Sequence, residues 1–276
     1  MLMIASPVRI LLLLAVAAFS QTPRGRVAIK EGTIVTDKGT LLRGAHISTD
    51  MFATAPSRAD IAKMKALGLN TIHLYAECSD NGAPGKRAAL IDGVVSATRA
   101  ESMYLIMVIG GCSKNGAYDS AFVMNFWKYY AAKYANETHM VYEIMNEPFG
   151  WSSPYDQRTI QMHKLAYDII HKAAPNTHVM FMGYSQAKLP DVSLQEIRSL
   201  QVIDWKNASI AIHGYENTSQ SLLAYIKAVQ AGGFAVTVTE PASVDDKFLG
   251  LPRSLWITRK LPGRDPSRLD GKRHPA

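Results

Sequence analysis

Apolar and polar positions follow two alternating patterns along the chain between residues 45 and 240. Short runs rich in apolar and β-branched residues predict buried strands, and each run is followed by a longer stretch with apolar positions at helical spacing. The predicted strands are Ala45–Ser48, Thr71–Ala76, Tyr104–Ile109, Met140–Met145, His178–Met182, Ser209–Ile212 and Phe234–Thr239. The predicted helices are Ser57–Leu67, Ala88–Glu101, Ala121–Tyr134, Gln157–Ala173, Ser193–Leu200 and Ser219–Ala231. Strands that alternate with helices indicate βαβ units, and therefore a parallel sheet.

A hairpin precedes the first of these strands, because Val27–Lys30 and Thr33–Thr36 flank a turn at Gly32. Seven strands within about 200 residues favour an α/β fold of the (β/α)8 TIM-barrel type over an open sheet. No Gly-x-Gly-x-x-Gly follows the first strand, which argues against a dinucleotide-binding fold. The eighth strand is not recognisable, and residues 255–258 are the one candidate for it. We therefore expect a barrel whose last βα unit is truncated or degenerate.

The first twenty residues have the pattern of an export signal. Arg9 precedes an apolar run from Ile10 to Ala18, and small residues follow, with a plausible cleavage point after Ser20. The run is too short to span a bilayer comfortably, although an uncleaved anchor helix remains the alternative. The sequence therefore predicts a signal peptide over 1–20, a barrel domain over 21–251 and a basic, disordered tail over 252–276. We expect a secreted, extracellular monomer that is not attached to a membrane after cleavage.

The net charge of +7 does not indicate a nucleic-acid partner. Arg9 and the tail together account for all but one of these charges, so the body of the chain is nearly neutral. The tail is expected to be a solvated end, with binding to acidic polymers as the alternative. Export also makes Cys78 and Cys112 candidates for a disulfide, the alternative being two unpaired thiols.

Polar side chains gather where the predicted strands end. They include His46, His73, Glu77, Asn146, Glu147, His213, Tyr215 and Glu240. In a barrel of this kind the active site lies at the carboxyl-terminal ends of the strands. Glu147 and Glu240 would place two carboxylates at one mouth, which is the arrangement that glycoside hydrolysis needs: one protonated to release the leaving oxygen and one ionised.

Several of these segments resemble glycoside hydrolase family 5, the cellulase family of barrel-fold retaining glycosidases. The matching segments are Leu42-Arg-Gly-Ala-His46, Ala66-Leu-Gly-Leu-Asn-Thr-Ile72, Val141-Tyr-Glu-Ile-Met-Asn-Glu-Pro148, His213-Gly-Tyr215 and Thr237-Val-Thr-Glu-Pro241. The resemblance runs from about residue 27 to 242, and its Asn-Glu-Pro segment is the specific part. It implies that Glu147 is the general acid/base and Glu240 the nucleophile. It also implies that Asn146 binds the sugar 2-hydroxyl and that His213 and Tyr215 position the carboxylates.

Two positions depart from the family pattern. The second strand of the family carries an arginine that supports the nucleophile, and this chain has His73 there. The third strand usually ends with a histidine, where this chain has Gly110 and Gly111. His46 and His73 are the candidates to compensate.

Some further residues are assigned by position. Glu143 lies four residues before Glu147 on the same strand and is expected to be a paired interior carboxylate. Trp151, three residues after Pro148, is expected to be a sugar-stacking platform. Trp127 and Trp205 are expected in the core or on the surface.

The sequence thus predicts a secreted retaining endo-β-1,4-glucanase that cleaves a polysaccharide or oligosaccharide by double displacement, with no metal or other cofactor. The alternatives are a β-mannanase of the same family and a catalytically impaired carbohydrate-binding pseudoenzyme. A third alternative is a metal-dependent barrel hydrolase that uses His46, His73, Glu77 and His213. It is disfavoured because such sites commonly begin with a His-x-His, and Ser48 stands at the second position.

Overall fold

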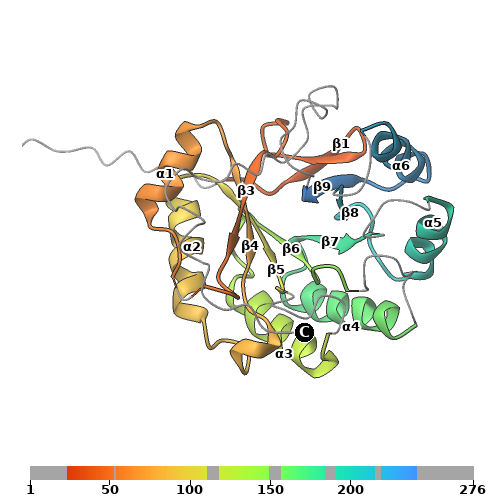
Figure 1. Ribbon diagram of the computed structural model, residues 1–276. Coiled ribbons are helices and arrows are strands. Elements are labelled where there is room, and N and C mark those ends of the chain that lie inside the picture. Colours follow the sequence, from red (N-terminus) through yellow and green to blue (C-terminus); the bar gives the residue numbers. More distant parts are fainter. Residues whose placement is uncertain are drawn as a thin grey trace, which may run out of the picture.

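A computed structural model describes residues 24–52, 54–110, 118–148, 157–183, 190–214 and 219–240 of the chain. Within these residues, seven parallel strands form one sheet whose spatial order is the order of the chain, and the sheet curls into a barrel-like wall (Figure 1). The strands are β3 (Gly44–Ser48), β4 (Thr71–Tyr75), β5 (Tyr104–Val108), β6 (Met140–Glu143), β7 (His178–Met182), β8 (Ala208–His213) and β9 (Val236–Glu240). All seven predicted strands are confirmed, and so is the predicted fold class.

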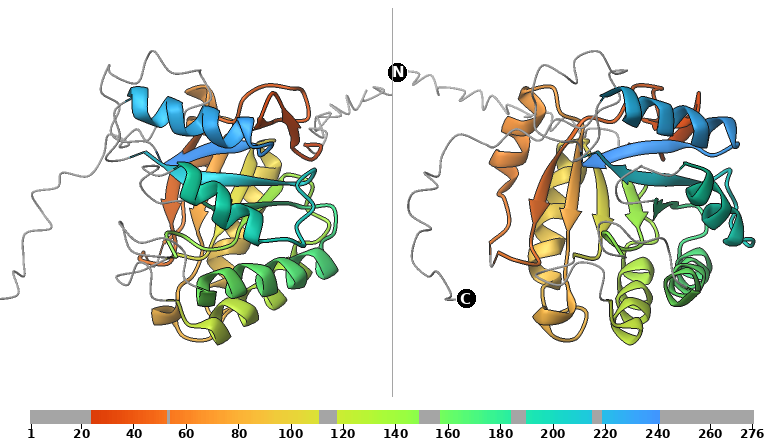
Figure 2. Two further views of the ribbon diagram at one scale, coloured as in Figure 1. Left: turned by 90° about the vertical axis from the view of Figure 1, so that its right-hand side faces the viewer. Right: turned by 45° about the vertical axis from the view of Figure 1, so that its right-hand side comes forward.

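Among the described residues, six α-helices alternate with these strands and cover the outer face of the wall (Figure 2). They are α1 (Arg58–Ala66), α2 (Ala88–Ala100), α3 (Ser120–Lys133), α4 (Gln157–Ala173), α5 (Pro190–Ser199) and α6 (Ser219–Ala231), with a 3₁₀ turn, η1 (Ser79–Asn81), after β4. Local signals explain their starts. Ser57 and Asp60 form a capping box at α1, and the Asp119 carboxylate accepts a hydrogen bond from the Ala121 amide at α3.

Side chains alternate between the two faces of each strand. The outward-facing positions, such as Leu74 and Leu105, pack with the helices in the larger apolar cluster. Trp127 belongs to that cluster: it is fully buried, and its indole N–H donates to the Ile144 carbonyl at 3.0 Å. Trp205 packs against the same cluster, so both tryptophans lie where the sequence placed them. No helix among the described residues is long and apolar enough to cross a membrane.

A β-hairpin closes the amino-terminal end of the barrel interior. Its strands β1 (Ala28–Lys30) and β2 (Thr33–Val35) pair antiparallel around a two-residue turn. Both turn residues, Glu31 and Gly32, have positive φ angles of 51° and 72°, which suits the right-handed twist of a tight hairpin. A second apolar cluster lies between the hairpin and the inward-facing strand residues: Val27, Ile34, Leu42, Tyr104, Ile106, Val141, Met180, Met182 and Ala211.

The hairpin is bound to distant parts of the chain. The Tyr104 hydroxyl on β5 accepts a hydrogen bond from the Asp37 amide at 2.8 Å. The Arg26 guanidinium donates to the Thr177 hydroxyl at 3.0 Å, and the Val236 amide of β9 donates to the Gly32 carbonyl at 2.8 Å. These bonds fix the hairpin beneath the sheet, so the interior opens at its other end.

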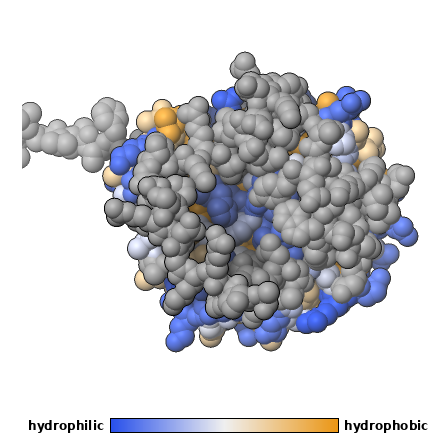
Figure 3. Space-filling model, in the orientation of Figure 1, coloured by the Kyte–Doolittle hydropathy of each residue, from blue (hydrophilic) through white to orange (hydrophobic). Residues whose placement is uncertain are grey.

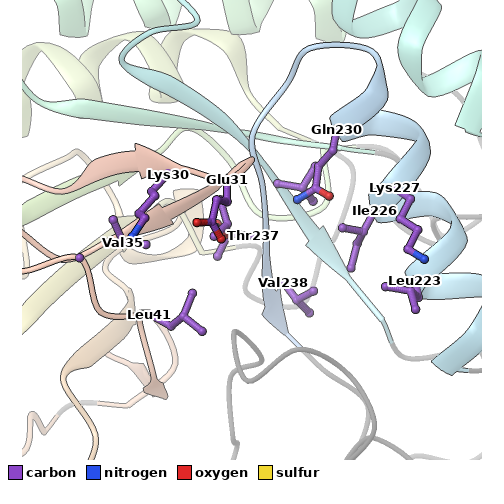
Figure 4. A pocket seen from close by; sticks show the side chains of 13 residues that line it. Lys30, Glu31, Val35, Leu41, Leu223, Ile226, Lys227, Gln230, Thr237 and Val238 are labelled. Atoms are coloured by element: carbon purple, nitrogen blue, oxygen red, sulfur yellow. The ribbon is translucent and has the colours of Figure 1, made fainter.

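The two edge strands of the sheet remain unjoined within the described residues, where β3 pairs only with β4 and β9 only with β8. A groove of about 410 Å³ lies beside β9, between the hairpin and α6 (Figure 4). Leu41 lines it from the hairpin side, Val238 from β9 and Leu223 from α6. The candidate eighth strand, residues 255–258, lies outside the described residues, as do the predicted signal peptide and tail. Cys78 is disulfide-bonded, and Cys112 falls outside the described residues.

Candidate active site

Glu147 and Glu240 come together at the carboxyl-terminal end of the barrel. Glu147 follows β6, and Glu240 is the last residue of β9. A carboxylate oxygen of Glu147, a carboxylate oxygen of Glu240 and a ring nitrogen of His213 all lie within 4.8 Å of one another. Both residues are buried: the exposed fraction of the whole residue is 3% for Glu147 and 8% for Glu240. The two acidic residues that the sequence singled out therefore share one site.

The backbone at Glu147 is strained. Its φ angle is 42°, in the left-handed region that residues with a side chain rarely adopt. Such a conformation costs about 1–2 kcal/mol, and it persists only where the surrounding structure imposes it. Strain of this kind is concentrated at functional sites.

His213 lies between the two carboxylates. Its Nδ1 is 2.7 Å from Oε1 of Glu147, and its Nε2 is 3.5 Å from Oε1 of Glu240. A register shift in the pairing of β8 and β9 falls between Ile212 and His213, and it sets His213 opposite Glu240. The imidazole is fully buried, so the bridge operates away from bulk water.

Burial changes the acidity of Glu240. Desolvation raises the pKa of its carboxyl to about 7, because an ionised carboxylate loses solvation when buried. The positive charge of His73 opposes that effect and lowers the pKa in part. A strongly shifted pKa in a buried carboxyl at the mouth of a barrel marks Glu240 as a candidate functional residue.

A buried ion pair between His73 and Glu143 lies deeper in the barrel interior than the two glutamates of the site. Nε2 of His73 on β4 lies 2.9 Å from Oε2 of Glu143 on β6, and neither side chain is exposed. Burial alone would lower the pKa of His73. The charge and hydrogen bond of Glu143, with the charge of Glu240, nevertheless raise that pKa above its ordinary value. The expectation that Glu143 is a paired interior carboxylate is confirmed, and His73 brings a cation toward Glu240.

His46 completes the aromatic and imidazole lining on the β3 side. Its ring centroid is 4.1 Å from that of Tyr75 and 5.8 Å from that of His73, both edge-on. Solvent reaches the His46 side chain, yet protein atoms surround it on most sides. This desolvation, followed by the charges of His73 and His213, lowers the pKa of His46 to about 3. His46 is therefore both reached by solvent and largely desolvated by the protein around it. A hydrophilic hollow is visible near the middle of the face in Figure 3.

Asn146 is held by two tyrosines that the sequence analysis missed. The Tyr75 hydroxyl donates to Oδ1 of Asn146 at 2.6 Å, and the buried Tyr118 hydroxyl donates to the Asn146 carbonyl. Tyr75 shares the inward face of β4 with His73, so the period-two pattern of that strand could have revealed it. Tyr118 lies ahead of α3 and carried no such signal.

Glu77 does not belong to the cluster. Its carboxylate accepts hydrogen bonds from the backbone amides of Gly85, at 2.9 Å, and of Arg87. It therefore holds the loop before α2, and this corrects its place in the metal-dependent alternative. Gly110 also has a structural explanation: a Cβ there would lie 2.0 Å from an oxygen of Asp50, so the Asp50 carboxylate requires a glycine. Two other predicted site residues, Tyr215 and Trp151, lie outside the described residues.

The barrel-like parallel sheet, with two close glutamate carboxylates at the carboxyl-terminal ends of its strands, defines the class of barrel-fold glycoside hydrolases. A family model, Cellulase (glycosyl hydrolase family 5), matches residues 35–247. The chain belongs to this family.

Individual relatives are more distant. Endoglucanase Z of Dickeya dadantii is 28% identical over 168 residues, which cover 59% of this chain and 36% of that protein. The chain thus spans about a third of the length of this curated relative. The catalytic domain of Thermobifida fusca endoglucanase Cel5A superposes with a TM-score of 0.65 at 17% identity, covering 85% of this chain and 84% of that chain. A variant of that domain has been solved with cellotetraose. A mannanase catalytic domain from Streptomyces sp. SirexAA-E gives 0.62 at 19% identity, covering 85% and 76%.

Proposed function

We propose that this protein is a retaining β-glycosidase that cleaves a β-1,4-linked glucan internally, with Glu147 as general acid/base and Glu240 as nucleophile. The observation that carries the proposal is the close approach of the two carboxylates, whose oxygens lie within 4.8 Å. Retaining enzymes hold their carboxyl groups about 5–5.5 Å apart, whereas inverting enzymes leave roughly 6.5–9.5 Å for a water molecule. The spacing supports direct attack on the sugar.

In the first step, an oxygen of Glu240 bonds to the anomeric carbon while the glycosidic C–O bond breaks. Glu147 gives its proton to the leaving oxygen. In the second step, Glu147 takes a proton from water, the water oxygen bonds to the anomeric carbon, and Glu240 leaves as a carboxylate. The side-chain amide of Asn146 faces the sugar 2-hydroxyl, and the two tyrosine contacts hold Asn146 for that task.

The first step needs Glu240 ionised and Glu147 protonated. Since burial raises the pKa of Glu240 to about 7, the acid limb of kcat/KM for the free enzyme is expected near pH 7. His213 contacts both carboxylates, so its imidazole offers a route by which the proton that Glu240 releases reaches Glu147. A pH profile whose acid limb lies near pH 4 would contradict this account of Glu240.

The substrate class rests on the relatives. Two of them are called endoglucanases and one structural neighbour a mannanase, so glucan is the first candidate and mannan the second. We expect reducing-sugar release from soluble β-glucan by purified residues 21–276, with glucomannan, mannan and xylan assayed beside it. Glu147→Ala and Glu240→Ala should lose this activity. Glu137→Gln is the matched control, because that carboxylate precedes β6 and pairs with Arg99 and His139.

Azide separates the two roles. In Glu147→Ala, an aryl glycoside with a good leaving group still forms the glycosyl-enzyme, and azide then replaces water to give a β-glycosyl azide. In Glu240→Ala, azide takes the place of the missing carboxylate and gives the α-azide. The opposite pairing of products would reverse the assignment. A folded wild-type protein that binds cello-oligosaccharide without turning over any substrate would establish the pseudoenzyme instead.

Export forms a second part of the proposal, supported by the pattern of residues 1–20. Expression of the full chain in a host with a secretory pathway should place the protein in the medium or periplasm, with an amino terminus at Gln21 by mass spectrometry. Full-length protein retained in the membrane fraction would identify an uncleaved anchor.

A further inference from the structure

A second group of metal-ligand side chains shares Glu240 with the proposed catalytic pair. One ligand atom each from His46, His73 and Glu240 lie within 4.8 Å of one another. The residues come from β3, β4 and β9, and His46 and His73 are direct neighbours in the parallel pairing of β3 with β4. Two imidazoles and one carboxylate form a donor set that zinc accepts readily, with bonds of about 2.0–2.2 Å.

The spacing is close to that of a metal site. Ligand atoms around one tetrahedral zinc ion lie roughly 3.4 Å apart, given those bond lengths. The group therefore needs to close by at most about 1.4 Å to hold one ion. Three protein ligands leave a fourth position for water, as open zinc sites do.

The surroundings of His73 resemble those of a metal-bound histidine. Glu143 lies 2.9 Å from one ring nitrogen, and both side chains are fully buried. In metal sites a carboxylate commonly holds one nitrogen of the imidazole and so presents the other nitrogen to the ion. Of the three ligands, His46 is reached by solvent and provides a path of entry, whereas His73 and Glu240 are buried.

We propose that His46, His73 and Glu240 bind a divalent transition-metal ion, with zinc preferred, in competition with substrate. The ion is an inhibitor here and not a cofactor, because coordination occupies the carboxylate that would attack the sugar. Binding itself is independent of the glycosidase proposal, and only the inhibitory consequence rests on it.

The binding test uses metal-free residues 21–276 without an affinity tag. Calorimetric titration with Zn²⁺ should show one saturable equivalent, and Co²⁺ should give the intense visible absorption of a four- or five-coordinate ion. His46→Ala and Glu240→Gln should each raise Kd by about tenfold or more, and Glu143→Gln by about 10–100-fold through the orientation of His73. His171→Ala is the matched control, since His171 is an exposed histidine at the end of α4.

Three results would overturn the proposal: no saturable binding by the wild type, unchanged affinity in His46→Ala, or loss of binding in Glu147→Gln but not in His46→Ala. The last result would place the ion in the neighbouring group of Glu147, His213 and Glu240. Circular dichroism of each variant verifies that it is folded.

The activity arm tests inhibition. Zinc should abolish hydrolysis in the wild type, a chelator should restore it, and His46→Ala should need at least about tenfold more zinc for half-inhibition. Full hydrolysis at zinc concentrations that saturate the calorimetric site would refute the inhibitory role. Zinc binding by a protein that hydrolyses no glycan would refute the proposed function and leave the metal site standing.

Discussion

The two ends of the barrel interior are built from the same strands with opposite chemistry. Toward the amino-terminal end, the inward positions of β5 and β6 are Ile106 and Val141, which pack on the hairpin in an apolar cluster. Toward the carboxyl-terminal end, β6 continues to Glu143 and the chain then reaches Glu147, both buried among imidazoles. Burial of apolar surface at the amino-terminal end therefore stabilises the folded state. At the carboxyl-terminal end, charged groups are buried instead.

This contrast assigns stability to the amino-terminal end of the barrel interior and reactivity to its carboxyl-terminal end. Buried apolar side chains stabilise the fold in proportion to the area they remove from water. Buried charges are costly unless they are paired, and the raised pKa of Glu240 reflects the cost of its desolvation. The left-handed backbone of Glu147 adds a conformational cost at the same end. In barrels of this kind the carboxyl-terminal face carries function, and the opposite face carries stability.

The largest expected effect belongs to Glu240→Gln. Removing the nucleophile should lower kcat by about 10⁴-fold or more on β-glucan, as the loss of nucleophiles does elsewhere. The free energy of unfolding should not fall, because the variant removes a desolvated carboxylate. Steady-state kinetics and urea denaturation on the same samples check both parts. If Glu240→Gln lost activity only because it unfolds, the carboxyl-terminal end would also be needed for stability, which would contradict the contrast between the two ends.

Ile106→Ala tests the opposite end. Ile106 is fully buried in the apolar cluster between the sheet and the hairpin, so its truncation should lower the free energy of unfolding by about 2–5 kcal/mol. Below the melting temperature kcat should stay near the wild-type value. Leu165→Ala, at an exposed position of α4, is the control and should change stability by no more than about 0.5 kcal/mol. A large fall in kcat for folded Ile106→Ala would show that the two ends are coupled.

The pH dependence of stability sharpens the comparison. The folded pKa of Glu240 is about 7 against an ordinary value of 4.5, so the folded state binds more protons than the unfolded state between these values. Stability from this group is therefore full below about pH 4.5 and is lost as the pH rises through 7. The stability of Glu240→Gln relative to wild type should increase by about 3 kcal/mol from pH 4 to pH 8. Denaturation midpoints across that range measure it, and a constant difference would contradict the raised pKa.

The smallest effect concerns the backbone of Glu147. Because its φ angle is 42°, a glycine fits there without strain. Glu147→Gly should therefore be about 1 kcal/mol more stable than Glu147→Ala, although glycine loses more conformational entropy on folding. Both variants lack the proposed acid, so activity does not complicate the comparison. Equal stabilities would place the strain elsewhere.

The elements of the fold could be predicted from the sequence because each buried strand is a short apolar run between turn signals. His178–Met182 and Gln157–Ala173 match the predicted bounds, and β9 starts two residues later than expected. The pairing of Glu143 could also be predicted, since period two places it inside the barrel below Glu147.

Other parts of the site depend on contacts that the pattern does not encode. The Tyr118 hydroxyl reaches the Asn146 carbonyl from a position outside any strand. Glu77 has the residue type of a ligand, but its backbone contacts with Gly85 and Arg87 appear only when the loop is folded. The requirement for Gly110 likewise arises from Asp50, sixty residues earlier in the chain.

The hairpin beneath the barrel has a consequence for the order of folding in time. Its residues are synthesised before those of the seven-stranded sheet. Arg26 nevertheless bonds to Thr177, and the hydroxyl oxygen of Thr33 lies 3.4 Å from that of Thr237, across a sequence separation of 204 residues. Contacts of such long range form slowly, because the intervening chain must first be closed into a loop. We therefore expect the hairpin to dock late, after β9 has been made, so that the amino-terminal end of the barrel interior closes in one of the last steps of folding.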